Sequence, residues 1–557
     1  MNDTSTTENR FFSKKNRLII LLIGISCFVL FFDLGGRGFQ NKDYLRFAES
    51  AREMMYTGDY IVPHYVGKVY LAKPPLFMWS IALLSKFNGS VTPFAARIPS
   101  AICALLSIIT VFLFGNHLYK NPFAGFFAGL VLLSNYMFFF YARIVKTDMM
   151  LTTFILTALY SFYMAYTSEP HKRRTFFMLF YVSISFGILA KGPLAFILPL
   201  LIIFTYLFIK KDLSFFKNMQ WLMGLCILLL MVGPWVILLS QKLGFNTIVK
   251  NVFSESVVRY GTAEYGHKQP FYFFFPELIK GFLPYSIFFP AIYFFLYSKK
   301  GEKQNVDRLW LSLWFTTIFI FMSFSRCKSG RYILPLYPAV ALMFGGMWAE
   351  VPFAETKNVF WGKWVKYTTI AAFAIIIIAS WGLLFYTRTH FTELFPISIG
   401  ICIVFTAAIV CRSFFKNLRN YTFSYAIIFL FFVSIGLVYM KELTAYNYNH
   451  SLGLDLANFV SQYVKEDELY YYKVPDECLS PIDFYLNRII PEVTEETQIA
   501  STFLSDKTIY CIVEKKAYNE TLAAFQHILH TPVDEVRYKD IDLILLKNIS
   551  NTYSTAW

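Results

Sequence analysis

The chain has 557 residues, of which 56% are hydrophobic and only 16% are charged, and its mean hydropathy is +0.47. Soluble domains are about 45–50% apolar and about 25% charged, so this composition excludes an ordinary soluble protein. The formal net charge of +15 would suggest a nucleic-acid partner in a soluble chain. In a membrane protein it instead reflects basic loops between apolar segments, so we expect an integral membrane protein without a nucleic-acid partner.

Apolar windows separated by charged residues and by Pro or Gly predict about thirteen transmembrane helices. They lie near residues 17–35, 96–117, 122–141, 149–167, 175–190, 193–209, 219–240, 281–298, 308–323, 332–349, 367–387, 395–411 and 421–440. The first window is too long for a removable signal peptide and lacks a small-residue cleavage site, so it predicts a retained anchor. Residues 1–440 are therefore expected to form an all-α polytopic membrane domain.

Lys and Arg are concentrated in alternate loops, such as "HKRR" at 171–174 and "SKKGEKQNVDR" at 298–308. An excess of basic residues marks the cytoplasmic side of a membrane protein. The N-terminus shares this excess, so it is predicted to be cytoplasmic. After an odd number of spans, everything beyond residue 441 is predicted to lie on the opposite face.

Residues 441–557 have a mixed polar and apolar pattern that predicts a small α/β domain. The segments "ELYYYKV", "KTIYCIVEK" and "DLILLKN" are typical of strands, and "PIDFYLNR" and "AYNETLAAFQHILH" are typical of helices. Cys478 and Cys511 both lie in this domain. A disulfide between them and two unpaired core thiols are both compatible with their spacing.

Polar residues that are unusual in an apolar chain fall at the exterior ends of the predicted spans or in exterior loops. They are Asp43, Arg46, Lys73, Arg143, Asp148, Lys191, His267, Lys328 and Arg331. Charged residues at the membrane edge are costly and normally face a cavity or one another. Basic residues on the exterior also run against the usual charge bias, which indicates a specific anionic partner.

Two of these positions have a plain structural alternative. The segment "NKDYLRFAESAREMM" at 41–55 predicts an interfacial helix with Asp43 and Arg46 on one face, which equally fits a surface ion pair worth tenths of a kcal/mol. Lys73 precedes two prolines that stiffen the chain, but a lysine at the headgroup level can also simply snorkel.

Two other segments bring charges to the exterior entrance of a span. In "YARIVKTDMM", Asp148 is a second acidic candidate, with helix capping by Thr147 or Asp148 as the alternative. In "SFSRCKSGRYILPLYP", Arg326, Lys328, Arg331 and Tyr332 lie in one exterior loop. This loop carries enough positive charge to hold a phosphate through charge-assisted hydrogen bonds.

Five successive segments together resemble a known family. They are "DYLRFAESAREMMYTGDYIVPHYVGKVYLAKPPLFMW…AARIPSA", "YARIVKTDMMLTTF", "LAKGPLAFILP", "RYGTAEYGHKQPFYFFF" and "SRCKSGRYILPLYPAVALM". Their order over residues 17 to about 345 is similar to that of polytopic GT-C glycosyltransferases that use polyprenyl-phosphate sugars, especially the aminoarabinose lipid A transferases. These enzymes are in turn similar in overall design to protein O-mannosyltransferases.

The resemblance implies roles for individual residues. Asp43 and Asp148 match the two acidic residues treated as catalytic, and Lys73 matches the lysine that holds the donor phosphate. The other implied donor-phosphate or substrate contacts are Arg46, Arg143, Lys191, His267, Lys328, Arg331 and Tyr332. Tyr44 and Ala72 stand where relatives have acidic residues. The second of these departures weakens any expectation of a divalent metal, for which His267 is the only candidate ligand.

The sequence thus predicts a multi-pass enzyme of the bacterial inner membrane with a periplasmic C-terminal domain. It would move a sugar, with an amino sugar among the candidates, from a polyprenyl (undecaprenyl) phosphate to lipid A or a related acceptor. The alternatives are a protein O-mannosyltransferase-like enzyme acting on Ser/Thr, transfer to another glycan or lipid, and a lipid-linked sugar flippase. Transporter charges usually gather near the bilayer midplane, whereas here they gather at one face. A nucleotide-sugar donor is not expected, because the sequence has no Gly-rich phosphate loop.

Overall fold

The computed structural model describes residues 13–36, 38–39, 42–261, 269–297, 308–356, 360–390, 395–414, 421–448, 453–464, 468–505, 507–523, 530–538 and 540–549. The chain divides into two compact units. The first, here called the helical unit, contains residues 1–34, 72–77 and 97–442. The second, here called the sheet unit, contains residues 35–71, 78–96 and 443–557.

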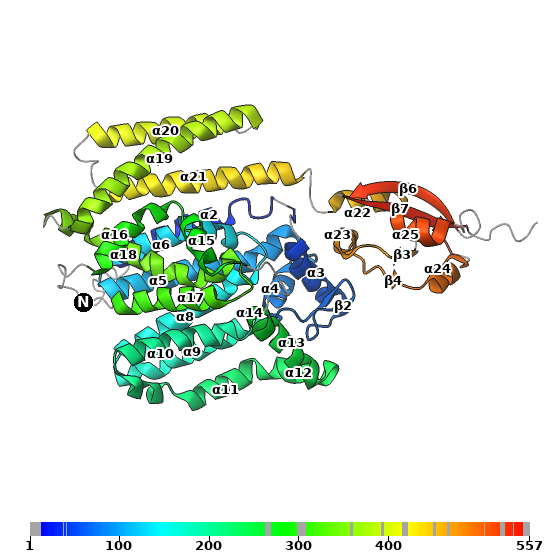
Figure 1. Ribbon diagram of the computed structural model, residues 1–557, viewed down its shortest axis with the longest axis horizontal. Helices are drawn as coiled ribbons and strands as arrows, with labels where there is room; N and C mark the ends of the chain where they lie inside the picture. The colour runs from blue at the N-terminus through cyan, green and yellow to red at the C-terminus, as the bar shows by residue number, and fades with distance from the viewer. Residues whose placement is uncertain are drawn as a thin grey trace, which may run out of the picture. The chain divides into compact units, whose positions relative to one another are not determined.

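The helical unit is a bundle of α-helices that run mostly side by side (Figure 1). Its helices are α2 (Lys14–Phe31), α5 (Pro93–Tyr119), α6 (Pro122–Ser134), α7 (Tyr136–Ala142), α8 (Thr147–Thr167), α9 (Pro170–Lys191), α10 (Leu194–Ile209), α11 (Trp221–Met231), α12 (Gly233–Leu243), α13 (Phe245–Phe253), α14 (Arg259–Gly261), α15 (Phe274–Gly281), α16 (Phe289–Tyr297), α17 (Arg308–Phe324), α18 (Tyr337–Thr356), α19 (Phe360–His390), α20 (Phe395–Phe414) and α21 (Tyr421–Tyr448).

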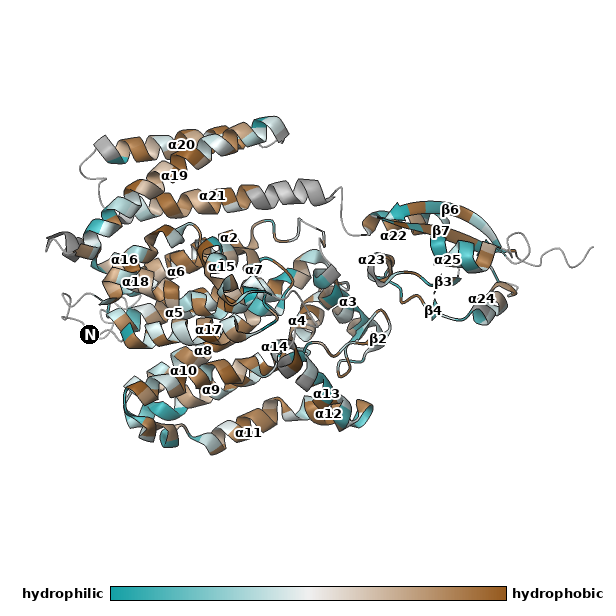
Figure 2. Cartoon of the chain, viewed as in Figure 1, coloured by the Kyte–Doolittle hydropathy of each residue, from teal (hydrophilic) through white to brown (hydrophobic). Residues whose placement is uncertain are grey.

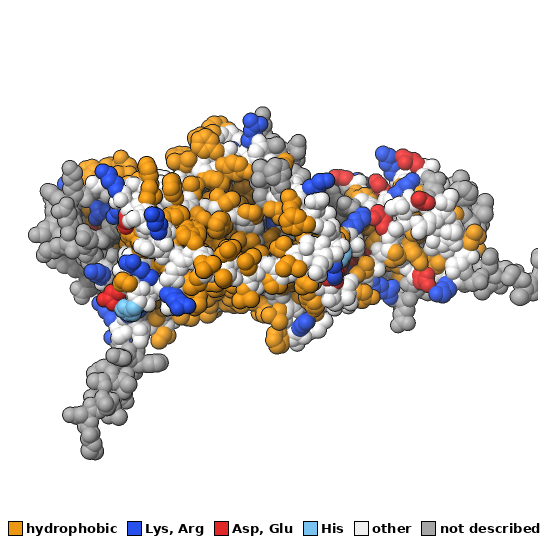
Figure 3. All heavy atoms as spheres, turned by 90° about the horizontal axis from the view of Figure 1, so that it is seen from below, with side chains coloured by type: hydrophobic (Ala, Val, Ile, Leu, Met, Phe, Trp, Pro, Cys, Tyr) orange, Lys and Arg blue, Asp and Glu red, His pale blue; other side chains and the backbone are white. Residues whose placement is uncertain are grey.

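A helix or a bent pair of helices occupies each of the predicted spans. Within the described residues, six helices are long and apolar enough to cross a membrane, or up to nine if each bent pair counts as one span. Further predicted spans correspond to shorter apolar helices such as Leu194–Ile209 and Arg308–Phe324. Hydrophobic residues dominate these helices, and on the face shown in Figure 3 they cover the middle of the bundle (Figures 2 and 3). The chain is a multi-pass membrane protein.

Small residues let the central helices approach closely. A Cβ on Gly125 of α6 would lie 2.2 Å from the carbonyl oxygen of Phe112 on α5. A Cβ on Gly345 of α18 would lie 2.2 Å from the carbonyl oxygen of Ala124 on α6. Close backbone contact at glycine is a common way for membrane helices to associate, so α6 is fixed between α5 and α18.

The predicted span 122–141 is broken between α6 and α7, which meet at an angle of 71°. Asn135 makes this break: its side chain accepts a hydrogen bond from the Phe138 amide at 3.0 Å and donates to the Leu132 carbonyl at 2.8 Å. It therefore caps the start of α7 and also satisfies the end of α6. The bend sets where the following residues, including Asp148, enter α8.

The C-terminal part of the sheet unit has a five-stranded sheet in the order β4-β3-β5-β7-β6. Its elements are α22 (Leu454–Tyr463), β3 (Glu468–Tyr472), α23 (Asp476–Leu486), β4 (Glu492–Val493), α24 (Glu496–Phe503), β5 (Ile509–Glu514), α25 (Lys515–Ala517), β6 (His530–Tyr538) and β7 (Ile541–Asn548). Strands β4, β3 and β5 are parallel, and β7 pairs antiparallel with both β5 and β6.

Two hydrophobic clusters fill this domain, and they separate the two cysteines. Cys478 belongs to the cluster with α22 and α23, and Cys511 belongs to the cluster with α24 and α25. Alternate residues of a strand point to opposite faces of a sheet, which is why β5 contributes to both clusters. The two thiols are core residues, and no disulfide joins them.

The sheet unit also includes residues from the first exterior segment, which the predicted division at 440/441 assigned to the membrane domain. These residues form α3 (Lys42–Thr57), the hairpin of β1 (His64–Tyr65) and β2 (Lys68–Val69), and most of α4 (Leu76–Ser85). Helix α3 packs against α23, and Val66 in the hairpin turn packs on the cluster of α22 and α23. The two segments pack together although about 400 residues separate them in the sequence. Such a contact leaves no local sequence pattern, so it was not predicted.

Candidate active site

Asp148 is the centre of a buried charge cluster in the helical unit. It lies in the first turn of α8 and is only 3% exposed. Its Oδ1 accepts a hydrogen bond from the Lys191 ammonium, and the Nε of Arg331 lies 3.7 Å from the same oxygen. One carboxylate thus faces two cations from different helices.

Local sequence explains how these three side chains meet. Lys191 is the last residue of α9, which ends because Gly192 adopts a positive φ of +88°. Arg331 lies in a short 3-10 helix, Gly330–Leu336, that leads into α18. Asp148 is not the N-cap of α8, since that position is Lys146, so the capping alternative is wrong for Asp148. A carboxylate in the first turn is still favoured by the helix dipole.

Tyr332 completes the cluster with its aromatic ring. The Lys191 ammonium lies 5.5 Å from the ring centroid, and the Arg331 guanidinium lies 5.6 Å from it. Cations attract the face of an aromatic ring most strongly where water is excluded. The ring therefore holds both cations beside Asp148 without neutralising either of them.

Lys73 adds a third cation, which is close enough to Lys191 to act on it electrostatically. Its Nζ lies 2.7 Å from Glu255 Oε2 and 2.5 Å from the Ala72 carbonyl oxygen. The side chains of Lys73 and Glu255 are 20% and 19% exposed, so a ligand can reach the pair. Sequence reasoning missed Glu255, because it lies 182 residues from Lys73 in a segment without a recognisable motif.

The five charged side chains described so far carry more positive than negative charge. Lys73, Lys191 and Arg331 face the carboxylates of Asp148 and Glu255. With these five described groups ionised, their charges sum to one positive charge in a largely apolar environment. Such an excess favours an anionic ligand, and a phosphate can accept charge-assisted hydrogen bonds from ammonium and guanidinium groups together.

Arg143, which we predicted to contact the substrate, has a different place. Its Nη1 donates to the carbonyl oxygens of Val29 and Leu30 at 2.7 and 2.9 Å, and its Nη2 donates to that of Phe32 at 2.5 Å. These carbonyls belong to the C-terminal end of α2, where the last turn leaves acceptors without intrahelical partners. Arg143 is 1% exposed, so we reassign it to capping α2.

Two more predicted residues stand apart from the cluster. The Lys328 ammonium donates to the backbone carbonyls of Ser325 and, at 3.2 Å, Gln269, and burial lowers its pKa. It therefore holds its own loop in place. His267 lies outside the described residues, and among those that are described no group of three His, Cys, Asp or Glu side chains could hold a metal ion.

Asp43 and Arg46 lie in the sheet unit, on α3 as predicted. Arg46 Nη1 lies 3.7 Å from Asp43 Oδ1, and the two side chains are 30% and 38% exposed. The Arg46 guanidinium also lies over the rings of Tyr65 and Tyr70, at 5.3 and 5.7 Å from their centroids. A carboxylate, a guanidinium and two aromatic rings are groups that can recognise a sugar or a phosphate.

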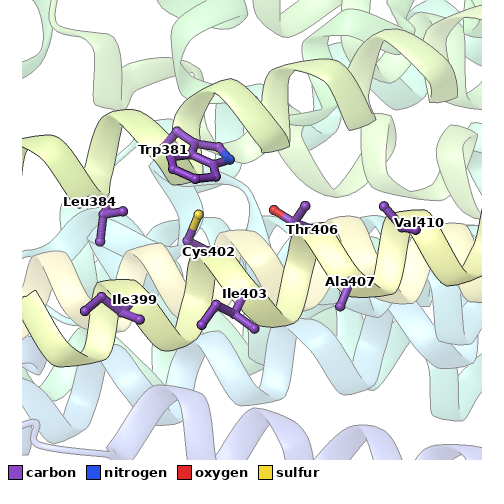
Figure 4. A pocket seen from close by; sticks show the side chains of 8 residues that line it. All are labelled: Trp381, Leu384, Ile399, Cys402, Ile403, Thr406, Ala407 and Val410. Atoms are coloured by element: carbon purple, nitrogen blue, oxygen red, sulfur yellow. The ribbon is translucent and has the colours of Figure 1, made fainter.

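A separate pocket lies between α19 and α20 and has a volume of about 510 Å³ (Figure 4). Its lining residues are Trp381, Leu384, Ile399, Cys402, Ile403, Thr406, Ala407 and Val410. None of them is charged, so this pocket does not hold a phosphate.

Comparisons with known proteins agree with the fold. Residues 72–238 match the family described as dolichyl-phosphate-mannose-protein mannosyltransferase. The crystal structure of ArnT from Cupriavidus metallidurans bound to undecaprenyl phosphate has a TM-score of 0.75 to this chain, at 21% identity, and covers 96% of this chain and 98% of its own. The chain therefore has the fold of this membrane protein.

The chain also has relatives in sequence. An undecaprenyl phosphate-alpha-4-amino-4-deoxy-L-arabinose arabinosyl transferase of Aeromonas salmonicida is 28% identical over 324 residues, and the match covers 57% of each chain. An uncharacterised protein of Aquifex aeolicus is 26% identical over 493 residues, which are 87% of this chain and 90% of that protein. The archaeal oligosaccharyltransferase AglB of Archaeoglobus fulgidus shares the fold more distantly, with a TM-score of 0.51 and 11% identity.

Proposed function

We propose that this transferase moves a sugar from a polyprenyl phosphate to an acceptor at the outer face of the bacterial inner membrane. The donor is an undecaprenyl-phosphate-linked sugar, an amino sugar in the first instance, and the acceptor is lipid A. The named arabinosyl transferases and the fold shared with ArnT support this choice. The match to the Aeromonas transferase covers a little over half of either chain, which is why donor and acceptor are proposals.

One observation carries the proposal: among the described residues, Lys73, Lys191 and Arg331 lie with the carboxylates of Asp148 and Glu255 in the apolar helical unit. Removing Lys73, Lys191 and Arg331 from water costs free energy that an ordinary structural pair would not repay. An anionic ligand completes the charge balance. A lipid phosphate fits this requirement, because its headgroup can reach the cluster while its prenyl chain stays in apolar surroundings.

The chemistry follows from where charge develops. The bond between the sugar C1 and the donor phosphate oxygen breaks, a bond from C1 to an acceptor oxygen forms, and the polyprenyl phosphate leaves with added negative charge. Fixed cations stabilise a developing charge most effectively in a site that excludes water. Lys73, Lys191 and Arg331 would serve this purpose, and Asp148 would hold two of them in position.

The acceptor side involves Asp43, whose catalytic role remains a prediction. If the acceptor oxygen belongs to a phosphate of lipid A, it is already ionised at neutral pH and needs no general base. Asp43 would then orient the acceptor or stabilise the positive charge that develops on the sugar. A Ser/Thr hydroxyl would instead need Asp43 to take its proton.

Mass spectrometry of lipid A from cells with and without the gene tests the proposal. We expect the loss of one sugar-sized mass increment, restored by the wild-type gene but not by Lys73→Ala. Lys172→Ala is the matched control, because Lys172 is an exposed cation near the opposite end of α9 from Lys191. An unchanged lipid A profile with a changed glycoproteome would favour the protein O-mannosyltransferase alternative, which the matched family description also supports.

The proposed orientation has a cytoplasmic N-terminus and a periplasmic sheet unit. The alternation of Lys and Arg between loops supports it. A reporter that is active only in the periplasm is expected to be active when fused after residue 557, and inactive when fused at Ser168, between α8 and α9.

A further inference from the structure

A second buried charge cluster lies in the sheet unit and joins two segments that are far apart in sequence. It contains Glu49, Arg52 and Glu53 from α3 and Asp483 from α23, all at most 5% exposed. The donor-binding role proposed above does not use it. Its hydrogen bonds connect α3 with the end of α23.

Arg52 makes these connections. Its Nε and Nη2 donate to the two carboxylate oxygens of Glu49 at 2.9 and 2.7 Å, which is the bidentate geometry that best fixes a guanidinium. Its Nη2 also donates to the Arg488 carbonyl at 2.8 Å, and its Nη1 donates to Asn487 Oδ1 at 3.3 Å. Asn487, with a φ of +54°, ends α23.

Neighbouring contacts extend this attachment. Glu53 Oε1 accepts from the Val66 amide at 2.5 Å, which holds the hairpin to α3, and Lys68 in the hairpin pairs with Glu492 of the C-terminal domain at 2.8 Å. The rings of Phe39 and Phe484 meet edge to face at 5.2 Å between centroids. The loop before α3, the helix itself and the hairpin after it are therefore all attached to the C-terminal domain.

We propose that Arg52 is a positioning residue, which fixes α3, the helix that carries Asp43 and Arg46, to the end of α23 in the C-terminal domain. This role rests on the proposed function, since it gives the C-terminal domain a part in transfer. Asp43 lies in the first turn of α3, and Arg52 lies nine residues later on the same helix. The domain then sets how α3 presents the two residues to the acceptor, and the donor phosphate is held independently in the helical unit.

The test uses the full-length enzyme in lipid nanodiscs and three variants: Arg52→Met, Arg52→Lys and the control Lys507→Met. Lys507 is an exposed lysine that pairs with Glu468 in the same domain without contacting α3. We expect Arg52→Met to lower kcat about 10- to 100-fold and to change the donor KM less than about twofold, and Arg52→Lys to recover part of kcat. Amide hydrogen exchange across residues 42–57 should rise in Arg52→Met, while exchange in β3, β5 and β7 stays as in the wild type. Lys507→Met should change neither quantity.

Arg52→Met leaves Glu49 buried without its counter-charge, so a neutral variant, Glu49→Gln with Arg52→Gln, provides the same test without that penalty. A wild-type kcat in either variant, with the five-stranded sheet still folded, would contradict the positioning role of Arg52. Failure of the proposed function looks different: Lys73→Ala would then keep its activity, or no sugar would reach any lipid acceptor even in the wild type.

Discussion

The two buried charge clusters differ in sign and in access. In the helical unit, three cations face two carboxylates, and Lys73 and Glu255 are each about one-fifth exposed. In the sheet unit, three carboxyls surround the single guanidinium of Arg52, and every member is sealed from solvent. An open cluster in which the named cations outnumber the carboxylates suits a phosphate ligand, whereas a closed cluster whose guanidinium is held by hydrogen bonds from two segments suits a joint between them.

The largest effect is expected from the open cluster. Replacing Lys191 and Arg331 together by Met should lower kcat/KM for the donor about 1,000-fold or more, because two charges facing the leaving phosphate are lost. Turnover of a synthetic polyprenyl-phosphate sugar measures this. A loss below about tenfold in folded protein would remove these residues from the site.

A smaller effect is expected from Asp148→Asn, which keeps the shape but removes the charge that holds Lys191 and Arg331 together. We expect a loss of about 10- to 100-fold in kcat, with a donor affinity equal to or tighter than that of the wild type, because the cations lose their competing carboxylate. Single-turnover kinetics separates the two quantities. A wild-type kcat in folded Asp148→Asn protein would contradict the role of Asp148 in holding the two cations.

Replacing Arg143 should lower the stability of the protein without lowering transfer, unlike a replacement within either cluster. Arg143→Met removes three hydrogen bonds to the end of α2 and should lower the thermal midpoint, at a cost of about 2–4 kcal/mol for buried charge-assisted bonds. Transfer per folded molecule should stay near the wild-type value. A normal midpoint with strongly reduced donor affinity would restore the substrate role predicted from sequence.

The closed cluster should respond to pH. Burial, with Glu49 beside them, raises the pKa of Asp483 to about 8 and that of Glu53 to about 7. These carboxyls ionise near pH 4 in the unfolded chain, so the folded state holds extra protons between about pH 4 and 8. Stability is then fully present at the acidic end of that range and is lost as the pH rises through the folded pKa values, by up to about 1.4 kcal/mol per unit for each group.

Asp483→Asn mimics the protonated carboxyl and should flatten this dependence. Its thermal midpoint should exceed that of the wild type at pH 8 and approach it at pH 5, whereas Glu495→Gln, at an exposed position in the same domain, should follow the wild-type curve. Thermal unfolding of the wild type and both variants between pH 5 and pH 8 is the measurement. Parallel curves for the wild type and Asp483→Asn would contradict the raised pKa.

The smallest effect is expected from Glu255→Gln. Glu255 holds the Lys73 ammonium that the donor phosphate needs, so removing its charge should tighten donor binding about two- to fivefold. Titration with undecaprenyl phosphate measures this. Weaker binding would mean that Glu255 contacts the substrate itself.

The sequence predicted most of the helical architecture and the core of the site, for physical reasons. Long apolar windows can form only helices in lipid, and costly charges such as Asp148 and Lys191 stand out against them. Glu255 and the capping role of Arg143 could not be predicted, because both depend on contacts more than 100 residues apart. The hydrogen bond between Arg52 and Arg488 could not be predicted for the same reason. The sequence showed only that Glu49, Arg52 and Glu53 lie on one predicted helix.

The edge strands show a further limit. β6 was missed because its alternating pattern includes Pro532, Asp534 and Glu535, which weaken strand propensity, and only pairing with β7 makes it a strand. β4 has two residues and carries almost no pattern. The spacing of Cys478 and Cys511 was compatible both with a disulfide and with two unpaired thiols. The sheet places them in different hydrophobic clusters.

The central claim is that Lys73, Lys191 and Arg331 bind the phosphate of a polyprenyl carrier. Binding of undecaprenyl phosphate to the purified full-length enzyme tests it most directly, with Lys73→Ala compared against Lys172→Ala. The account predicts that Lys73→Ala raises Kd at least tenfold and that Lys172→Ala leaves it unchanged. Equal Kd values for both variants and the wild type would contradict it.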